Sequence, residues 1–154
     1  MALEEAVIDP AIRAEIEALL TEHAWMIDHH RCENLFELYT EDGKMVGAGH
    51  DTVGRAALQE WGRNRAQMRE RQARHVISNL RLISIGPGLL RGGCVVTLYR
   101  YEGEGVGPAR PVAIADLEDT YERCSDGRWR IKTRNIVPVF ETPAHPAGIA
   151  SPER

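Results

Sequence analysis

Apolar residues at the start of the chain recur at three- and four-residue intervals, as on one face of a helix. Asp9-Pro10 has the form of an N-cap followed by proline at the first helical position. The apolar stripe that follows comprises Ile12, Ile16, Leu19, Leu20, His23 and Ile27. This spacing predicts one amphipathic helix over residues 10–29.

Two further helices are predicted before residue 73. A short one covers 33–39, and Glu41-Asp42-Gly43 supplies the turn that ends it. A brief strand at 44–46 and a glycine-rich loop at 47–52 come next. The third helix runs over 54–71, capped by Asp51 or Thr52, and its apolar stripe comprises Ala57, Leu58, Trp61 and Met68.

The pattern changes at residue 73 to the two-residue alternation of strands and keeps it to about residue 140. Four strands are predicted, at 73–85, 90–102, 111–124 and 128–140. In the last strand one face carries Trp129, Ile131, Thr133, Asn135 and Val137, and the other carries Arg128, Arg130, Lys132 and Arg134.

Helices first and antiparallel strands afterwards predict an α+β fold, in which a curved mixed or antiparallel sheet wraps around the long N-terminal helix. Residues 1–141 form one domain in this interpretation, because a single core suffices for a chain of 154 residues. Residues 142–154 contain Pro143, Pro146 and Pro152 and are predicted to form a tail.

The charge balance argues against nucleic acid and membranes as partners. The net charge is −4, and no apolar run approaches the roughly 18 residues that span a bilayer. Cys32, Cys94 and Cys124 are odd in number and widely spaced, which indicates reduced thiols rather than disulfides or a zinc site. We therefore expect a cytoplasmic protein that acts on a small molecule.

The candidate catalytic pair is His75, at the start of a strand, and Asp28, at the end of the first helix. Imidazole can take and return a proton near neutral pH, and a buried aspartate on its far nitrogen would fix the tautomer. The alternatives are a histidine that bonds a carbonyl and a helix-terminal surface carboxylate. A metal site built from His50, Asp51 and His75 is the weaker alternative, and no metal is expected.

Six further residues are candidates for substrate binding: Asp116, Tyr99, Tyr101, Asn79, His50 and His23. Asp116 stands in an apolar strand, where it would orient His75 or pair with Arg100 or Arg134. The two tyrosines would polarise a substrate oxygen or pack in the core with a wet hydroxyl. Asn79 shares the face of His75 by the two-residue period, or caps a bulge. His50 lies in the glycine-rich loop and His23 on the apolar stripe.

The order of elements and four local patterns resemble the nuclear-transport-factor-2-like superfamily. The patterns are Asp28 at a helix end, Gly54 followed by Leu58, Arg74-His75, and the Asp126-Gly127-Arg128-Trp129-Arg130-Ile131 turn. Within the superfamily the chain is most similar to the SnoaL-like branch of the scytalone dehydratase and bile acid 7α-dehydratase type. The resemblance covers roughly residues 10–140.

This resemblance implies a cone-shaped α+β barrel with a deep apolar pocket, a homo-oligomer (dimer or trimer), and a His75–Asp28 pair that works without metal or organic cofactor. The relatives' pocket tyrosines fall at Ile27 and near His23 here, and a second pocket histidine falls near Arg100. These departures imply a different way of activating the leaving group.

The function that follows is a cofactor-independent, dehydratase-like lyase for a small apolar hydroxylated molecule, aromatic compounds included. Retro-aldol cleavage of a carbon–carbon bond and double-bond isomerisation use the same base and stay open. A non-catalytic ligand-binding or assembly subunit is the alternative of another class, since the fold alone does not establish activity.

Overall fold

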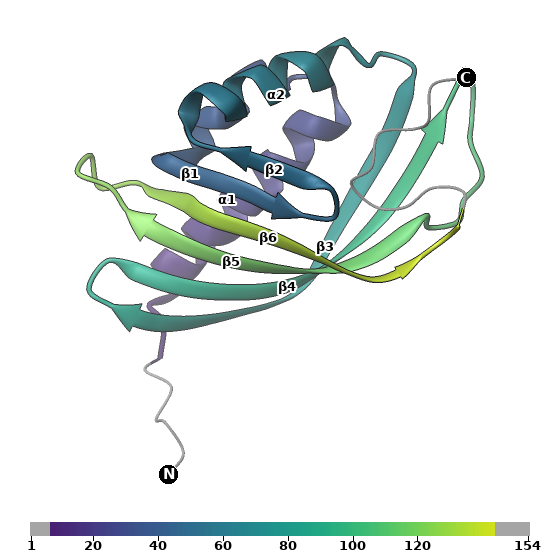
Figure 1. Cartoon of the computed structure of the whole chain (residues 1–154). Coiled ribbons are helices and arrows are strands. Elements are labelled where there is room, and N and C mark those ends of the chain that lie inside the picture. The colour runs from purple at the N-terminus through teal and green to yellow at the C-terminus, as the bar shows by residue number, and fades with distance from the viewer. Residues whose placement is uncertain (1–6, 144–154) are drawn as a thin grey trace.

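The computed structural model describes residues 7–143, which form three helices and six strands (Figure 1). In chain order the elements are α1 (Pro10–Asp28), the 3₁₀ helix η1 (Cys32–Leu38), β1 (Tyr39–Gly47), β2 (His50–Val53), α2 (Arg55–Gln67), β3 (Arg71–Gly86), β4 (Leu89–Glu102), β5 (Ala113–Arg123) and β6 (Trp129–Glu141). The α+β class is confirmed. The predicted tail lies outside the described residues from position 144 onward.

All six strands belong to one curved sheet with the order β2-β1-β6-β5-β4-β3. The β1–β6 pair is parallel and the other pairs are antiparallel, so the sheet is mixed. In Figure 1 helix α1 crosses one face of the sheet, and α2 covers the end formed by β1 and β2. The sheet wraps the helix as predicted, but within residues 7–143 it stays open between β2 and β3.

Helix α1 begins and packs as its sequence requires. The Asp9 side chain accepts a hydrogen bond from the Ala11 N–H at 2.8 Å, and Pro10 occupies the first turn. The face toward the sheet buries Ile16, Leu19, Leu20, His23, Ile27 and Asp28. Burial of each apolar side chain stabilises the folded protein by roughly 1.5–3 kcal/mol. This burial fixes the rotation of the helix about its axis and so turns Asp28 inward.

No helix among the described residues has the length and apolar character that crossing a membrane requires.

The glycine-rich segment 47–52 is partly a strand and not wholly a loop. Gly47, Ala48 and Gly49 have φ angles of 81°, 48° and 84°, and this left-handed stretch reverses the chain. Strand β2 then pairs with β1, starting from Gly47 opposite His50. The reversal matters for the site because it brings the His50 ring against Trp61 of α2. Helix α2 ends at Gln67, four residues before the predicted limit.

Strand β6 departs from strict alternation. Its partner residues step from Tyr121–Ile131 to Thr120–Thr133, which leaves Lys132 as an extra residue in a bulge. Ile131 is buried on one side of this bulge and Arg134 on the other. The prediction that Arg134 lies on the face opposite to Ile131 is therefore wrong, because one extra residue turns the side chains that follow it to the other face.

Candidate active site

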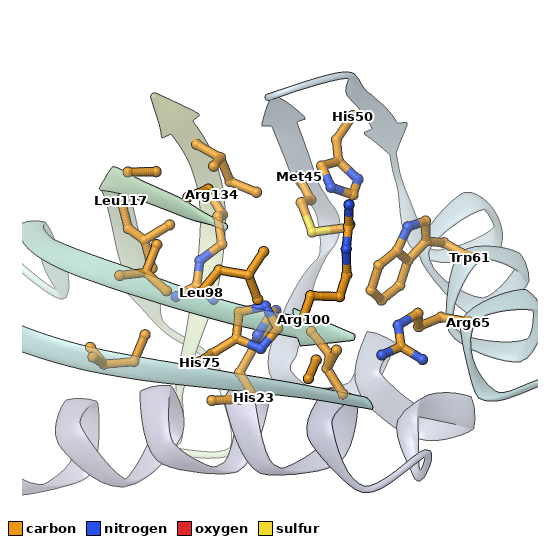
Figure 2. A pocket seen from close by; sticks show the side chains of 18 of the residues that line it. His23, Met45, His50, Trp61, Arg65, His75, Leu98, Arg100, Leu117 and Arg134 are labelled. Atoms are coloured by element: carbon orange, nitrogen blue, oxygen red, sulfur yellow. The ribbon is translucent and has the colours of Figure 1, made fainter. Parts of the chain in front are cut away.

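A cavity of about 370 Å³ lies between α1, α2 and the curved sheet. Most of its wall is apolar, which suits a small and largely apolar ligand. Figure 2 shows several of its side chains, among them His23, His50 and His75, pointing into this space. The apolar wall includes Leu20, Ile27, Ile77, Val96, Leu98 and Leu117.

The structure brings Asp28 and His75 together at the wall of this cavity. The His75 Nδ1 and Asp28 Oδ1 atoms are 2.6 Å apart, and the backbone N–H of His75 donates to Asp28 Oδ2 at 2.9 Å. The Asp28 side chain is only 6% exposed, whereas the His75 side chain is 24% exposed and lines the cavity. The carboxylate is thus enclosed behind the imidazole, and the imidazole faces the ligand space.

This arrangement selects one tautomer of His75. A carboxylate only accepts hydrogen bonds, so Nδ1 carries the ring hydrogen and donates the hydrogen bond to Asp28. The other ring nitrogen, Nε2, is then left without a proton and can accept one from a ligand. A positive charge that forms on the ring lies 2.6 Å from the carboxylate and is stabilised by it.

His23 lies in the same cavity wall but is built to stay neutral. Its Nε2 is 2.9 Å from the hydroxyl of Tyr39, and both residues are buried. Burial lowers the pKa of His23 well below its usual value, and the charges of Arg134, His75 and His50 lower it further. Burial also raises the pKa of Tyr39, so this hydrogen-bonded pair carries no charge near neutral pH.

His50 reaches the cavity from β2 and packs edge-on against Trp61, with 5.8 Å between the ring centroids. Burial lowers the pKa of His50. Both predicted ligand-binding histidines, His23 and His50, therefore line the cavity as neutral hydrogen-bonding groups.

Four other predicted binding residues do not line the cavity. Val96, Leu98 and Arg100 of β4 face it, so Tyr99 and Tyr101 lie on the opposite face of that strand. The predicted pocket role of both tyrosines is wrong for this reason.

Asp116 and Asn79 also point away from the cavity. The neighbours of Asp116 in β5, Ala115 and Leu117, line the cavity, and Asp116 itself is exposed. Asn79 has a φ of 59° and lies in a bulge, where the pairing steps from Ser78–Val95 to Arg81–Gly93. The bulge breaks the alternation that would have placed Asn79 beside His75.

Sequence reasoning missed Arg134, which lines the cavity from β6 and is 3% exposed. Its guanidinium is held by Asp119, with Nη2–Oδ2 at 2.7 Å and Nε–Oδ1 at 3.1 Å. The Tyr121 hydroxyl donates to the same carboxylate at 2.8 Å. Asp119 occupies a position in β5 that shares a face with Ala115, Leu117 and Tyr121, and a carboxylate on this apolar face was the signal that a cation had to lie nearby.

Among residues 7–143, no three His, Cys, Asp or Glu side chains are grouped so that they could hold a metal ion. The three cysteines are free thiols, and burial raises the pKa of Cys94 to about 11.

Comparison with known proteins shows the family to which this chain belongs. Two solved structures share the fold over most of both chains. A protein provisionally assigned as a scytalone dehydratase, from Novosphingobium aromaticivorans, is 20% identical with a TM-score of 0.74, and the match covers 91% of this chain and 95% of the other. LinA is 26% identical with a TM-score of 0.69, and the match covers 90% and 92%.

A third structure, a protein of unknown function with a cystatin-like fold from Nostoc punctiforme, is 18% identical with a TM-score of 0.72, over 90% of this chain and 98% of that one. No curated protein matches this sequence. The model of the SnoaL-like domain matches residues 11–135. The chain belongs to the SnoaL-like domain family, within the nuclear-transport-factor-2-like superfamily.

Proposed function

We propose that this protein is a cofactor-independent lyase that removes water from a small, largely apolar hydroxylated molecule. This substrate class includes aromatic compounds. The family includes dehydratases and isomerases, which is consistent with an enzyme. The observation that carries the proposal is the Asp28-bound imidazole of His75 facing a largely apolar cavity.

In the proposed reaction Nε2 of His75 removes a proton from the carbon next to a carbonyl or an aromatic ring. The electron pair of the broken C–H bond forms a carbon–carbon double bond, and the C–O bond to the neighbouring hydroxyl breaks. The hydroxide takes a proton and leaves as water. Atoms and charges balance, because His75 gains one proton in the first step and returns one in the last.

His75 itself is the best placed group to protonate the leaving hydroxyl. The lining residues that the structure describes include no carboxyl or phenol, and burial lowers the pKa of both His23 and His50. A single group that serves first as base and then as acid requires the proton and the hydroxyl to lie on the same face of the substrate. The predicted stereochemistry is therefore syn elimination.

The buried guanidinium of Arg134 supports this assignment. Negative charge builds up on the substrate oxygen as the proton leaves, and a fixed cation in a largely apolar cavity stabilises such charge. Asp119 holds the guanidinium in place, so it does not have to reorganise during the reaction.

Retro-aldol cleavage and double-bond isomerisation share the first proton transfer and differ in the bond that breaks afterwards. A non-catalytic module has no need of an Asp28–His75 pair or of an open cavity, so both features support an enzyme over that alternative.

The test is His75→Ala, assayed for turnover on cyclic and polycyclic hydroxy ketones and phenolic alcohols. We expect a loss of about 10²–10⁴-fold, because the base is gone while the cavity remains. Matched thermal unfolding shows whether the fold survives. His29→Gln is the control, because His29 is the C-cap of helix α1, directly after Asp28, and lies outside the cavity lining. Turnover retained in His75→Ala would refute the mechanism.

A further inference from the structure

The cavity wall carries an unusual amount of positive charge for an apolar pocket. Arg65, Arg71 and Arg100 line it in addition to Arg134, and no aspartate or glutamate is among the described lining residues. Charged side chains rarely face an apolar cavity without a function, because removing them from water is costly.

Arg65, Arg71 and Arg100, here called the arginine end, come from three elements that meet beside α2. Arg65 lies on α2 and is only 6% exposed. Arg71 and Arg100 lie on the adjacent strands β3 and β4, where Arg100 pairs with Ala73 in the ladder. Figure 2 shows Arg65 near Trp61 and the Arg100 side chain extending into the cavity in the direction of His50.

The three guanidinium groups repel one another electrostatically. Burial lowers the pKa of Arg65 and of Arg100, and the charge of Arg71 lowers each of them further. Glu102 partly offsets this repulsion, since its Oε1 lies 2.6 Å from Nε of Arg71 and its charge raises the pKa of Arg65 and Arg100. The charge of Asp28 also raises the pKa of Arg65. Two carboxylates beside three cations still leave an excess of positive charge, which favours a further anion.

The arginine end also stands at a defined spacing from the base. His75 pairs with Leu98 across the ladder, so Arg100 lies two residues further along β4 on the same face. Two strand residues correspond to about 7 Å. One aromatic or alicyclic ring can bridge this separation between an anchored group and a reacting carbon.

We propose that the arginine end binds a carboxylate of the ligand, so that the substrate is the anion of a small carbocyclic carboxylic acid. This inference rests on the proposed function and names its substrate class. Guanidinium groups match the planar carboxylate with paired hydrogen bonds. The apolar remainder of the cavity, about 370 Å³ in all, accommodates a ring system.

The experiment compares the affinities of 2-naphthoate and its neutral isostere 2-naphthamide by calorimetry. Wild-type protein is expected to bind the carboxylate at least about tenfold more tightly than the amide. Arg100→Gln should remove most of this preference while changing the affinity for the amide by less than about twofold. Arg65→Gln should act in the same way, with thermal unfolding to show that this buried position tolerates the change.

Arg91→Gln is the matched control, because Arg91 lies on the same strand as Arg100, is exposed and is not a lining residue. It should keep the full preference. His75→Gln should also keep it, which separates this inference from the catalytic proposal. Equal binding of the two naphthalene compounds, no binding of either, or equal losses for both in Arg100→Gln would overturn the assignment. Tighter binding of 2-naphthyl phosphate than of 2-naphthoate would overturn the choice of a carboxylate.

Discussion

The Asp28 carboxylate binds His75 at two points, through Nδ1 and through the backbone N–H. The backbone contact fixes the position of the carboxylate relative to β3, and the ring contact fixes the tautomer. A carboxylate that made only the ring contact could rotate with the imidazole. The second contact therefore keeps Nε2 directed at the cavity.

Asp28→Asn tests this arrangement with almost no change of shape. The amide NH₂ can face Nδ1 only if that nitrogen gives up its proton, which places the proton on Nε2 and blocks the base. We expect turnover to fall by about 10³–10⁴-fold, as when a buried triad aspartate is replaced by asparagine. Steady-state kinetics measure the loss, and thermal unfolding shows whether folding is retained.

Asp116→Asn is the control for this substitution, because Asp116 is exposed on the opposite face of β5. Its turnover should stay within about twofold of wild type, since surface changes away from special features have small effects. Turnover of Asp28→Asn within tenfold of wild type would contradict the proposed role of the carboxylate.

Single residues could be predicted where a helix end or a strand start marks them, as for Asp28 and His75. The faces of Asp116, Tyr99 and Tyr101 could not be predicted, because alternation shows which residues share a face of a strand but not which face of the sheet is concave. Asn79 and Arg134 could not either. A bulge reverses the alternation, and no local signal in the sequence fixes the position of the extra residue.

At the scale of elements, α2 is held against η1 by contact between backbones. The Cys32 thiol donates to the Gly62 carbonyl at 3.3 Å, and a Cβ on Gly62 would lie 2.1 Å from the Cys32 carbonyl oxygen. Only glycine fits there. Because α2 also carries Trp61 and Arg65, this contact sets the position of one cavity wall.

Gly62→Ala should therefore lower the free energy of unfolding by about 1–3 kcal/mol, the range for overpacked sites. The preference of helices for alanine, about 1 kcal/mol over glycine, acts in the opposite direction and should be outweighed. Urea unfolding measures the difference. Gly93→Ala is the control, since a Cβ there meets nothing within 4 Å, and it should be neutral. A Gly62→Ala variant as stable as wild type would show that the two helices move apart freely.

The three helices and the four long strands were predicted well, because apolar spacing reports which side of an element is buried. Strand β1 was predicted too short, at 44–46, and β2 was missed, because neither segment shows a clear apolar alternation. The pairing of β1 with β6 could not be predicted in this way, since two strands far apart in the sequence carry no local mark of their partnership. The strand order of the sheet came only from the structure.

At the scale of the whole molecule, burial of His23 couples stability to pH. The pKa of His23 is lowered in the folded state, so below about pH 6.5 the unfolded chain binds a proton that the native protein does not. The free energy of unfolding should then fall as the pH falls, by up to about 1.4 kcal/mol per pH unit for this residue. His50 acts in the same direction, because burial lowers its pKa too.

Urea unfolding from about pH 8 to about pH 5 measures this slope. His23→Gln should flatten the acid side of the curve without abolishing it, because His50 remains. A His23→Gln curve that runs parallel to the wild-type curve would show that His23 titrates alike in both states.

The homo-oligomer and the cytoplasmic location stay predictions.

The parallel pairing of β1 with β6 also has a consequence for biosynthesis. Met45 of β1 lies opposite Arg134 of β6, and both line the cavity. A nascent chain on the ribosome therefore holds α1, η1 and β1 long before the strand that completes their sheet has been made. Contacts this distant in sequence form slowly. The ligand cavity should close late, after β6 has emerged and docked between β1 and β5.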